Sequence, residues 1–184
     1  MITSFFKLLK NEKPLTVAGA INPYSALLAK KTGIKALYIS GAGVANASFG
    51  LPDLALTSLD NVLEDLRRIR GISDLPILVD CDTGWGSALN ISKTTKEMIS
   101  AGASGIHIED QVSEKRCGHR PNKEIVSSDE MCDRIKAARD AISDDDFMLM
   151  ARTDAFAKEG LESCLLYTSP SPRDKHRSRM PSSA

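Results

Sequence analysis

Residues 76–82, with the sequence Pro76-Ile-Leu-Val-Asp-Cys-Asp82, decide the fold of this chain. The run begins with apolar residues, contains two acids near its end, and is followed by the turn residues Thr83-Gly84-Trp85-Gly86. A short apolar run bounded by a turn is typical of a strand buried on both faces, as in a parallel sheet. Because side chains alternate along a strand, Asp80 and Asp82 point to the same face. The stretch therefore predicts a buried strand that carries paired carboxylates to one edge of a sheet.

Similar apolar runs and helical patterns alternate on both sides of this strand. The other predicted strands are residues 15–20, 36–40, 105–110 and 147–153. The predicted helices between the strands are residues 24–32, 57–69, 91–101 and 127–142. Two of these helices begin with capping signals, Thr57-x-x-Asp60 and Ser127-x-x-Glu130. This alternation predicts a parallel sheet covered by helices.

Two α/β architectures fit the alternation, an open doubly wound sheet and a closed (β/α)8 barrel, and both place ligands at the carboxyl ends of strands. Polar residues end four successive strands: Ser40, Asp80 with Asp82, Glu109 and Arg152. Their convergence on one site favours the barrel, and the lack of a GxGxxG turn after the first strand disfavours a nucleotide-binding sheet. A barrel needs about 250 residues. The sequence therefore predicts a (β/α)8 TIM barrel that is truncated after about five strands.

Length, charge and cysteine content restrict the class of protein. The chain has 184 residues, 42% of them hydrophobic, and 24 basic residues balance 24 acidic ones. This zero net charge gives no sign of a nucleic acid or a membrane surface as partner, and no apolar run approaches the roughly 18 residues of a transmembrane helix. Residues 1–10 predict an amphipathic surface helix rather than a signal peptide. The four cysteines form no CxxC pair, which favours a reduced, cytoplasmic protein.

The composition changes near residue 163. Residues 164–184 are rich in Ser, Pro and Arg and show neither a helical nor a strand period. The plain interpretation is a disordered tail that follows a single domain of residues 1–163. A sharper interpretation is that Cys164 to Asp174 is the direct translation of a transposon adapter used in sequencing libraries, and that Ser178 to Ala184 resembles the primer that follows it. We therefore expect residues 164–184 to be non-native and to carry no function.

The segment Lys115-Arg-Cys-Gly-His-Arg120 is the strongest candidate for a catalytic loop. Four potential cations flank Cys117, and such surroundings lower the pKa of a thiol. The segment follows the predicted strand 105–110, where a loop at the end of a barrel strand would begin. The alternative is that Cys117 is a small buried hydrophobic residue.

Acidic residues at the strand ends suggest a metal site. Asp80 and Asp82 suit a hard divalent ion that retains waters, which favours Mg²⁺, and the alternative is a pair of solvated turn acids. Glu109 could hold a metal-bound water, or could be a surface carboxylate or a partner for Arg152. Arg152 could clamp a substrate carboxylate through two hydrogen bonds, or could form a salt bridge with Asp80 or Glu109.

The residues up to 163 resemble the isocitrate lyase and phosphoenolpyruvate mutase superfamily. Six motifs in the order of that family carry the resemblance: Tyr38-Ile-Ser-Gly-Ala-Gly43, Leu51-Pro-Asp53, Val79-Asp-Cys-Asp-Thr-Gly84, Ile106-His-Ile-Glu-Asp-Gln111, Lys115-Arg-Cys-Gly-His-Arg120 and Met150-Ala-Arg-Thr-Asp154. The cysteine motif and Arg120-Pro-Asn-Lys123 are similar to the branch that acts on 2-methylisocitrate. Mutases of the superfamily lack the loop cysteine, so Cys117 favours a lyase.

The resemblance implies a Mg²⁺-dependent retro-aldol cleavage of a small tricarboxylate, 2-methylisocitrate, into pyruvate and succinate in the methylcitrate cycle of propionate degradation. Asp80 and Asp82 would hold the ion, with Glu109 in its water shell. Substrate would be bound by a set of five residues. These are Ser40, Gly41, Ala42, Gly118 and Arg152.

The resemblance also implies catalytic roles on the loop and on the second strand. Tyr38 is the candidate base, Cys117 the candidate acid, and His119 and Lys115 would support the charge of a loop that closes over the ligand. The whole protein would be a homotetramer with further substrate-binding residues on later strands, so residues 1–184 alone are expected to be inactive. Two alternatives stay open, a related lyase or hydrolase acting on isocitrate or oxaloacetate, and a non-catalytic fragment.

Overall fold

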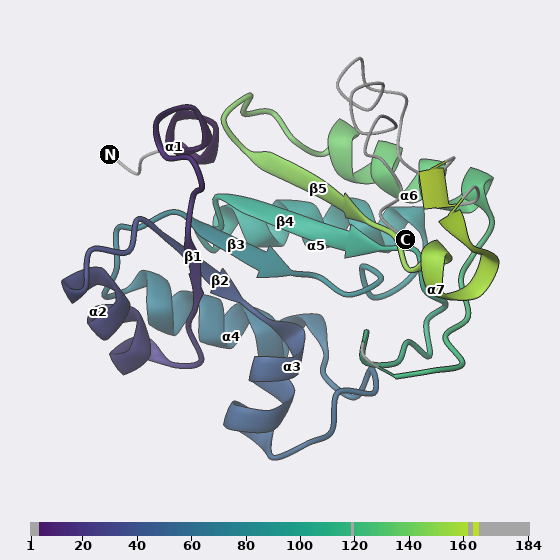
Figure 1. Ribbon diagram of the computed structural model, residues 1–184, viewed down its shortest axis with the longest axis horizontal. Helices are drawn as coiled ribbons and strands as arrows, with labels where there is room; N and C mark the ends of the chain where they lie inside the picture. Colours follow the sequence, from purple (N-terminus) through teal and green to yellow (C-terminus); the bar gives the residue numbers. More distant parts are fainter. Residues whose placement is uncertain (1–3, 119, 162–163, 166–184) are drawn as a thin grey trace, which may run out of the picture.

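Five parallel strands form one sheet at the centre of the computed structural model, which describes residues 4–118, 120–161 and 164–165 (Figure 1). The strands in chain order are β1 (Val17–Gly19), β2 (Ala36–Ile39), β3 (Ile77–Asp80), β4 (Gly105–Glu109) and β5 (Met148–Arg152). All five predicted strands are confirmed, although each is shorter than predicted by one or two residues at one or both ends.

The order of the strands identifies the architecture. Each strand pairs with the next one along the chain, in the order β1-β2-β3-β4-β5, and every pair is parallel. A doubly wound sheet reverses its strand order at a switch point, and this sheet does not. The sheet is therefore wound like part of a (β/α)8 barrel, as predicted, and within the described residues β1 and β5 are its two open edges.

The helices that follow the strands cover the outer face of this sheet (Figure 1), whereas the amino-terminal helix packs on its inner face. The helices are α1 (Phe5–Asn11), α2 (Pro23–Lys31), α3 (Gly41–Gly43), the π-helix η1 (Val44–Ser48), α4 (Leu59–Arg70), α5 (Ala88–Ser100), α6 (Ser128–Asp140) and α7 (Ala155–Glu159). The four predicted helices between strands are confirmed as α2, α4, α5 and α6. Among the described residues, no helix is long and apolar enough to cross a bilayer.

The Gly-rich stretch after β2 forms α3 and η1, with the hydroxyl of Ser40 as the N-cap acceptor. One local prediction was wrong. The cap of α4 is Ser58, which forms a capping box with Asn61, and not Thr57 with Asp60. Thr57 is instead buried, and its carbonyl accepts a hydrogen bond from the indole of Trp85 at 3.0 Å.

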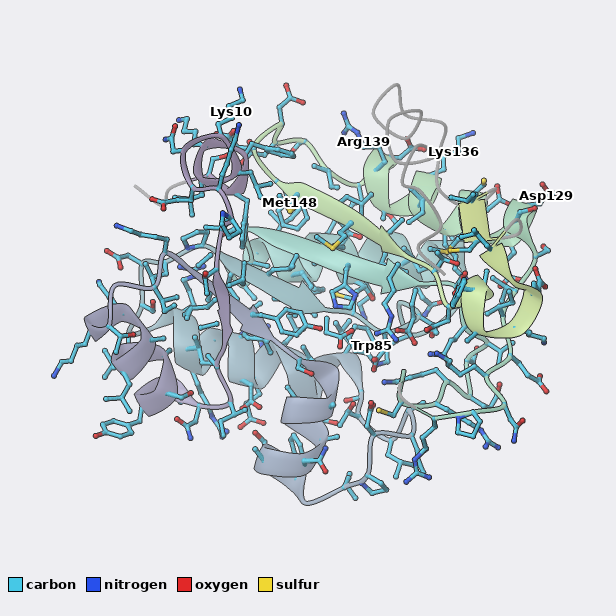
Figure 2. The ribbon with its side chains drawn as sticks, viewed as in Figure 1. Lys10, Trp85, Asp129, Lys136, Arg139 and Met148 are labelled. Carbon is cyan, nitrogen blue, oxygen red and sulfur yellow. The ribbon has the colours of Figure 1, made fainter. Side chains whose placement is uncertain are left out.

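The inner face of the sheet is closed at the amino ends of the strands by α1. Phe5 and Leu8 of this helix are buried and pack with Ala36, Leu78 and Met148. Figure 2 shows Met148 at the start of β5 and Lys10 on the outer side of α1. The predicted amphipathic helix is therefore confirmed, but its apolar side belongs to the core.

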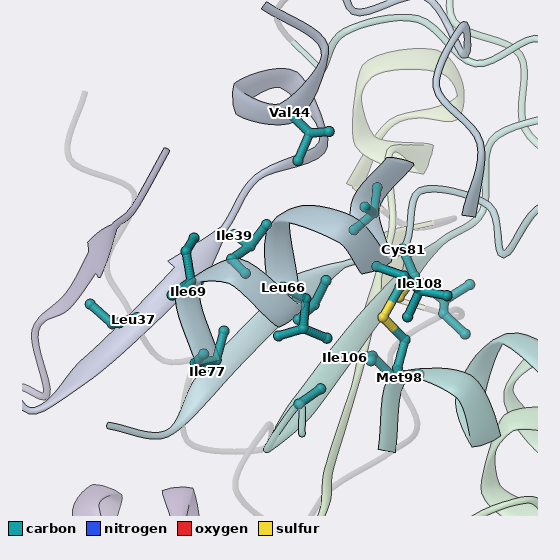
Figure 3. Close-up of a cluster of buried hydrophobic side chains, with 14 of the residues drawn as sticks. Leu37, Ile39, Val44, Leu66, Ile69, Ile77, Cys81, Met98, Ile106 and Ile108 are labelled. Atoms are coloured by element: carbon teal, nitrogen blue, oxygen red, sulfur yellow. The ribbon is translucent and has the colours of Figure 1, made fainter. Parts of the chain in front are cut away.

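The main core lies between the outer face of the sheet and the helices (Figure 3). Because side chains alternate along each strand, every second strand residue enters this core. These strand residues are Leu37, Ile39, Ile77, Val79, Ile106 and Ile108, and all are at most 1% exposed. The residues between them face the opposite side, where the carboxyl ends of the strands carry polar groups.

Leu66 tests how much this core stabilises the chain. It is 0% exposed on α4, whereas Leu89 on α5 is 84% exposed. We expect Leu66→Ala to lower the free energy of unfolding by about 2 to 5 kcal/mol, because it leaves a cavity in a close-packed interior. We expect the matched control Leu89→Ala to change it by less than about 0.5 kcal/mol. Urea unfolding followed by circular dichroism checks both, and equal effects of the two variants would contradict this description of the core.

Candidate active site

A cavity of about 410 Å³ lies at the carboxyl ends of β2 to β5, beside the loop that follows β4. It is lined by Tyr38, Ser40, Ala42, Asp53, Asp80, Glu109, Lys115, Arg116, Cys117, Gly118 and Arg152. The structure thus brings together eight of the eleven residues predicted for the site. Gly41 and Asp82 lie directly behind Asp80, and His119 lies outside the described residues.

The register of the sheet explains this convergence. Asp80 is paired with His107 across β3 and β4, and Glu109 is paired with Arg152 across β4 and β5. Because residues two apart on a strand share a face, these four side chains stand in successive layers on the inner face. The strands therefore present acids and bases to one cavity, and the apolar residues between them face the helices.

Asp80 is the centre of a hydrogen-bond network on the floor of the cavity. Its carboxylate accepts hydrogen bonds from the Tyr38 hydroxyl at 3.2 Å, the Gly41 amide at 3.0 Å and the Asp82 amide at 3.1 Å. His107 Nε2 lies 2.8 Å from the Tyr38 hydroxyl and 3.5 Å from Asp80 Oδ1. Because the Gly41 amide already donates to Asp80, it is not available to a substrate carboxylate in this conformation.

The environment of Tyr38 keeps its phenol protonated. Burial and the negative charge of Asp80 both raise the pKa of Tyr38. Burial also lowers the pKa of His107, so its ring is neutral, and its single N–H can donate to the Tyr38 oxygen while the phenol proton is donated to Asp80. Tyr38 is therefore a hydrogen-bond donor here, and its predicted role as a base stays a prediction.

Lys115 is buried between two acids. Its ammonium is 2.7 Å from Asp82 Oδ1 and also contacts Asp53, which follows η1 in the chain. Burial disfavours the charged ammonium, but Asp82 and Asp53 outweigh this effect and raise the pKa of Lys115. The sequence suggested that this cation acts on the thiol of Cys117, whereas the structure directs it to the carboxylates.

Asp82 Oδ1 is buried and has the Lys115 ammonium 2.7 Å away, but among the described residues it has no well-aligned hydrogen bond. Burial and repulsion from Asp80 raise the pKa of Asp82 to about 6, although Lys115 opposes the shift. The raised pKa shows that Lys115 does not fully offset the burial of two neighbouring carboxylates, so a further cation bound between Asp80 and Asp82 would stabilise their charged forms.

Glu109 and Arg152 form an ion pair on the wall of the cavity. Arg152 Nη1 lies 2.9 Å from Glu109 Oε2, and Arg152 Nη2 lies 3.1 Å from Asp154 Oδ2. Burial raises the pKa of Glu109 to about 8 even though Arg152 favours its charged form. The side chain of Arg152 is still 34% exposed and lines the cavity, so it can receive a substrate carboxylate as well.

The donor set fits a Mg²⁺ ion that has few protein ligands. A Cβ on Gly41 would lie 3.0 Å from Asp82 Oδ1 and 3.3 Å from Asp80 Oδ2, so both carboxylates reach the same place and only glycine leaves it open. Across the described residues, no three His, Cys, Asp or Glu side chains form a complete metal cage. Mg²⁺ binds to one or two carboxylates and keeps several waters, which agrees with Asp80, the Asp82 oxygen that lacks a hydrogen bond, and Glu109 farther away.

The loop that carries Cys117 is fixed at both ends. Gln111 and Ile125 form an antiparallel bridge, and the amide of Val112 donates to the carbonyl of Glu124 at 3.0 Å. Cys117 is half-buried at the cavity. Gly118 packs directly against the Arg152 guanidinium, where a side chain would collide with it. The stems of the loop thus place the thiol beside the arginine.

The pKa of Glu109 predicts how stability depends on pH when a chelator is present. The pKa is about 8 in the folded chain against an ordinary value of 4.5, so the folded state holds a proton that the unfolded state loses. Stability should therefore fall as pH rises from about 4.5 to about 8. Urea unfolding across this window checks the sign, and Glu109→Gln should flatten the slope. A slope that is unchanged in the variant would contradict the assignment.

Comparison with known proteins gives one consistent family. The chain matches the phosphoenolpyruvate phosphomutase family over residues 5–167. It is 60% identical over 158 residues to 2-methylisocitrate lyase of Shewanella oneidensis, covering 86% of this chain and 54% of that protein. It is 57% identical over 163 residues to 2-methylisocitrate lyase of Escherichia coli, covering 88% and 55%. The chain thus spans about half the length of the curated relatives it matches.

Solved structures agree with these sequence matches. Oxaloacetate acetylhydrolase bound to 3,3-difluorooxalacetate superposes with a TM-score of 0.82 at 38% identity, covering 87% of this chain and 56% of that one. 2,3-Dimethylmalate lyase gives 0.81 at 34% identity, covering 91% and 58%. Phosphonopyruvate hydrolase, in a complex with oxalate and Mg²⁺, gives 0.70 at 32% identity, covering 84% and 54%. All three share the arrangement of strands and helices described above.

Proposed function

Because the chain belongs to the phosphoenolpyruvate phosphomutase family, within the phosphoenolpyruvate mutase/isocitrate lyase superfamily, we propose that the whole protein is a carbon–carbon lyase that cleaves 2-methylisocitrate. The observation that carries the proposal is the shared cavity on which Asp80, Cys117 and Arg152 meet. Relatives that are 56–60% identical to the chain and named 2-methylisocitrate lyase support this choice of substrate.

The proposed reaction is a retro-aldol cleavage. The substrate hydroxyl loses its proton and becomes the carbonyl of pyruvate, while the bond between the hydroxyl-bearing carbon and its neighbour breaks. The electron pair of that bond passes to the neighbouring carbon, which takes up one proton and becomes part of succinate. The site must therefore hold carboxylates, accept one proton and return another.

Residues of this chain can meet the first demand and offer one candidate for the second. Arg152 lines the cavity and would bind a substrate carboxylate, and Ser40 and Ala42 also line the cavity. A bound Mg²⁺ would be held by Asp80 and Asp82, with Glu109 through water, and would supply polarisation of the forming carbonyl. Tyr38 lines the cavity and stays the candidate for the first proton transfer, a role that requires its phenolate, which burial and Asp80 disfavour in the absence of the ion.

Cys117 would meet the third demand as general acid. Its thiol stands on a loop that is attached to the sheet by its stems and borders the cavity. A thiol loses its proton far more readily than a hydroxyl, so it can protonate a developing carbanion. Closure of such a loop over the substrate would also exclude water from the carbanion.

The activity is proposed for a protein longer than this chain. Met150 on the open edge strand β5 is 43% exposed on the inner face, where a barrel normally packs further strands. We propose that the remaining strands complete the substrate site, that the whole protein is a cytoplasmic homotetramer of propionate degradation, and that residues 164–184 are non-native. Sequencing the gene beyond the codon for Ser163 tests the extent of the native chain.

A coupled assay tests the proposed reaction. The whole protein, purified with Mg²⁺, should release pyruvate from 2-methylisocitrate, which lactate dehydrogenase and NADH would detect. Residues 1–184 alone should release none. Oxaloacetate hydrolysis is the second candidate, favoured by the TM-score of 0.82 to oxaloacetate acetylhydrolase, and isocitrate belongs in the same panel. If the protein prefers oxaloacetate or isocitrate to 2-methylisocitrate, the substrate assignment is wrong. If it turns over none of the three acids, a non-catalytic role is favoured.

A further inference from the structure

Two buried side chains hold the peptide units on either side of Cys117, and one carboxylate joins them. These three residues are Gln111, Lys123 and Asp154, called the Cys117 clamp below. None of them was a candidate from the sequence. We propose that the clamp positions the thiol over the cavity, an inference that rests on the proposed function for its effect on turnover.

The first arm of the clamp holds the residue before Cys117. Oε1 of Gln111 accepts a hydrogen bond from the Arg116 amide at 3.0 Å, and Nε2 of Gln111 donates to the Arg116 carbonyl at 3.0 Å. The same Nε2 lies 2.8 Å from Glu109 Oε1 and 3.0 Å from Asp154 Oδ2. Gln111 is 0% exposed, so its amide oxygen holds Arg116 and its amide nitrogen joins Arg116 to Glu109 and Asp154 at the strand ends.

The second arm holds the residue after Cys117. The ammonium of Lys123 donates to the Gly118 carbonyl at 2.8 Å and to Asp154 Oδ1 at 2.7 Å. The side chain of Lys123 is only 7% exposed. Burying an ammonium is costly unless it is paired and hydrogen-bonded, so its place beneath the loop is explained by these two contacts.

Asp154 joins the two arms at the end of β5. One of its oxygens receives Lys123, and the other receives Gln111 and Arg152. Its own amide donates to Asp110 Oδ1 at 2.8 Å, which fixes its backbone to the end of β4. The thiol is therefore tied, through the peptides on both sides of it, to the same carboxylate that holds the substrate-facing arginine.

The role proposed for the clamp is to position Cys117, and the clamp residues themselves transfer no proton. Gln111, Lys123 and Asp154 do not line the cavity, so they are positioning residues. A misplacement of about 1 Å can cost about 100-fold in rate. Loosening the Lys123 arm should therefore lower kcat with little change in KM, whereas a change at Asp154 should also raise KM because Asp154 holds Arg152. Either change should leave the Cys117 segment more open to solvent.

Two substitutions in the whole protein test the clamp. Lys123→Met removes one arm but keeps the length of the side chain. Asp154→Asn leaves a single acceptor oxygen for three donors. Each should lower kcat by about 10- to 100-fold, and each should accelerate alkylation of Cys117 by iodoacetamide, measured by peptide mass spectrometry, by at least about 3-fold. Hydrogen exchange of the Arg116 amide should also become faster.

Matched controls come from α6. Lys136 and Asp129 lie on the outer surface, pointing away from the sheet (Figure 2), and Lys136→Met and Asp129→Asn should change none of these readouts. Lys123→Arg keeps the cation and should restore alkylation and kcat toward the wild-type values. The double variant should be hardly slower than the slower single one, because the two residues belong to one unit.

Three results would overturn the clamp. These are unchanged alkylation of Cys117 in both variants, additive losses in the double variant, or losses of kcat that follow entirely from a lower melting temperature. Alkylation needs no turnover, so the two proposals fail separately. If alkylation responds but the wild-type protein does not cleave 2-methylisocitrate, the proposed function is wrong and the geometric claim about the clamp stands.

Discussion

Cys117→Ser in the whole protein is expected to lower kcat by about 10² to 10⁴-fold, the usual contribution of a general acid. The serine hydroxyl has nearly the same size but holds its proton far more tightly than a thiol. The loop stems and the clamp would stay in place, since neither uses the sulfur atom. KM should therefore change little, and steady-state kinetics with the pyruvate assay separates the two parameters.

Cys132→Ser is the control for this substitution. Cys132 is an exposed thiol on α6, outside the cavity, and its replacement should leave turnover unchanged. If Cys117→Ser keeps kcat within about 3-fold of wild type, Cys117 is not the acid. The lyase could then still operate, but protonation of the succinate carbanion would need another donor.

Asp82→Asn is expected to have the second large effect. It should lower kcat/KM by about 10³-fold, because several kcal/mol of charge stabilisation would be lost with the cation. The amide has the same shape as the carboxylate, so packing is preserved. Mg²⁺ should raise the melting temperature of the wild-type protein by binding to the folded state, and it should raise that of the variant much less.

Two further variants separate loss of the metal from loss of the ion pair between Asp82 and Lys115. Asp65→Asn removes a buried carboxylate of α4 that does not line the cavity, and it should leave protection by Mg²⁺ intact. Lys115→Met removes the cation beside Asp82 but keeps both aspartates. If Asp82→Asn acts only by releasing Lys115, Asp82→Asn and Lys115→Met should cause equal losses, and Mg²⁺ should still protect both proteins. That result would contradict the metal site.

Local patterns in the sequence were sufficient to predict the sheet and most of the cavity. The apolar runs are buried because they alternate with helices whose faces cover them, and each predicted strand formed. Polar residues at the ends of four strands had to meet, because parallel strands in sequential order bring their carboxyl ends to one edge. Ser40, Asp80, Glu109 and Arg152 do meet there.

The partners of those residues could not be predicted in the same way. Lys115 binds to Asp53, 62 positions earlier in the chain, and Gln111 and Lys123 bind to Asp154, 43 and 31 positions later. Such contacts depend on loop paths that no period in the sequence describes. Lys123 belongs to the stretch Arg120-Pro-Asn-Lys123 that carries the family resemblance, but the sequence assigned it no role, and only its burial and its two contacts show that it supports the loop.

Cys81 sits between Asp80 and Asp82, but its thiol is 0% exposed and packs among the core residues on the helix side. The segment of residues 80–82 thus places its two acids at the candidate site and its thiol in the apolar core. The labelling rate of Cys81 therefore measures local opening of this region, because a thiol reagent can reach the sulfur only when the helices and the sheet separate. Any ligand that stabilises Asp80 and Asp82 in the folded state should therefore slow the labelling of Cys81 by a thiol reagent.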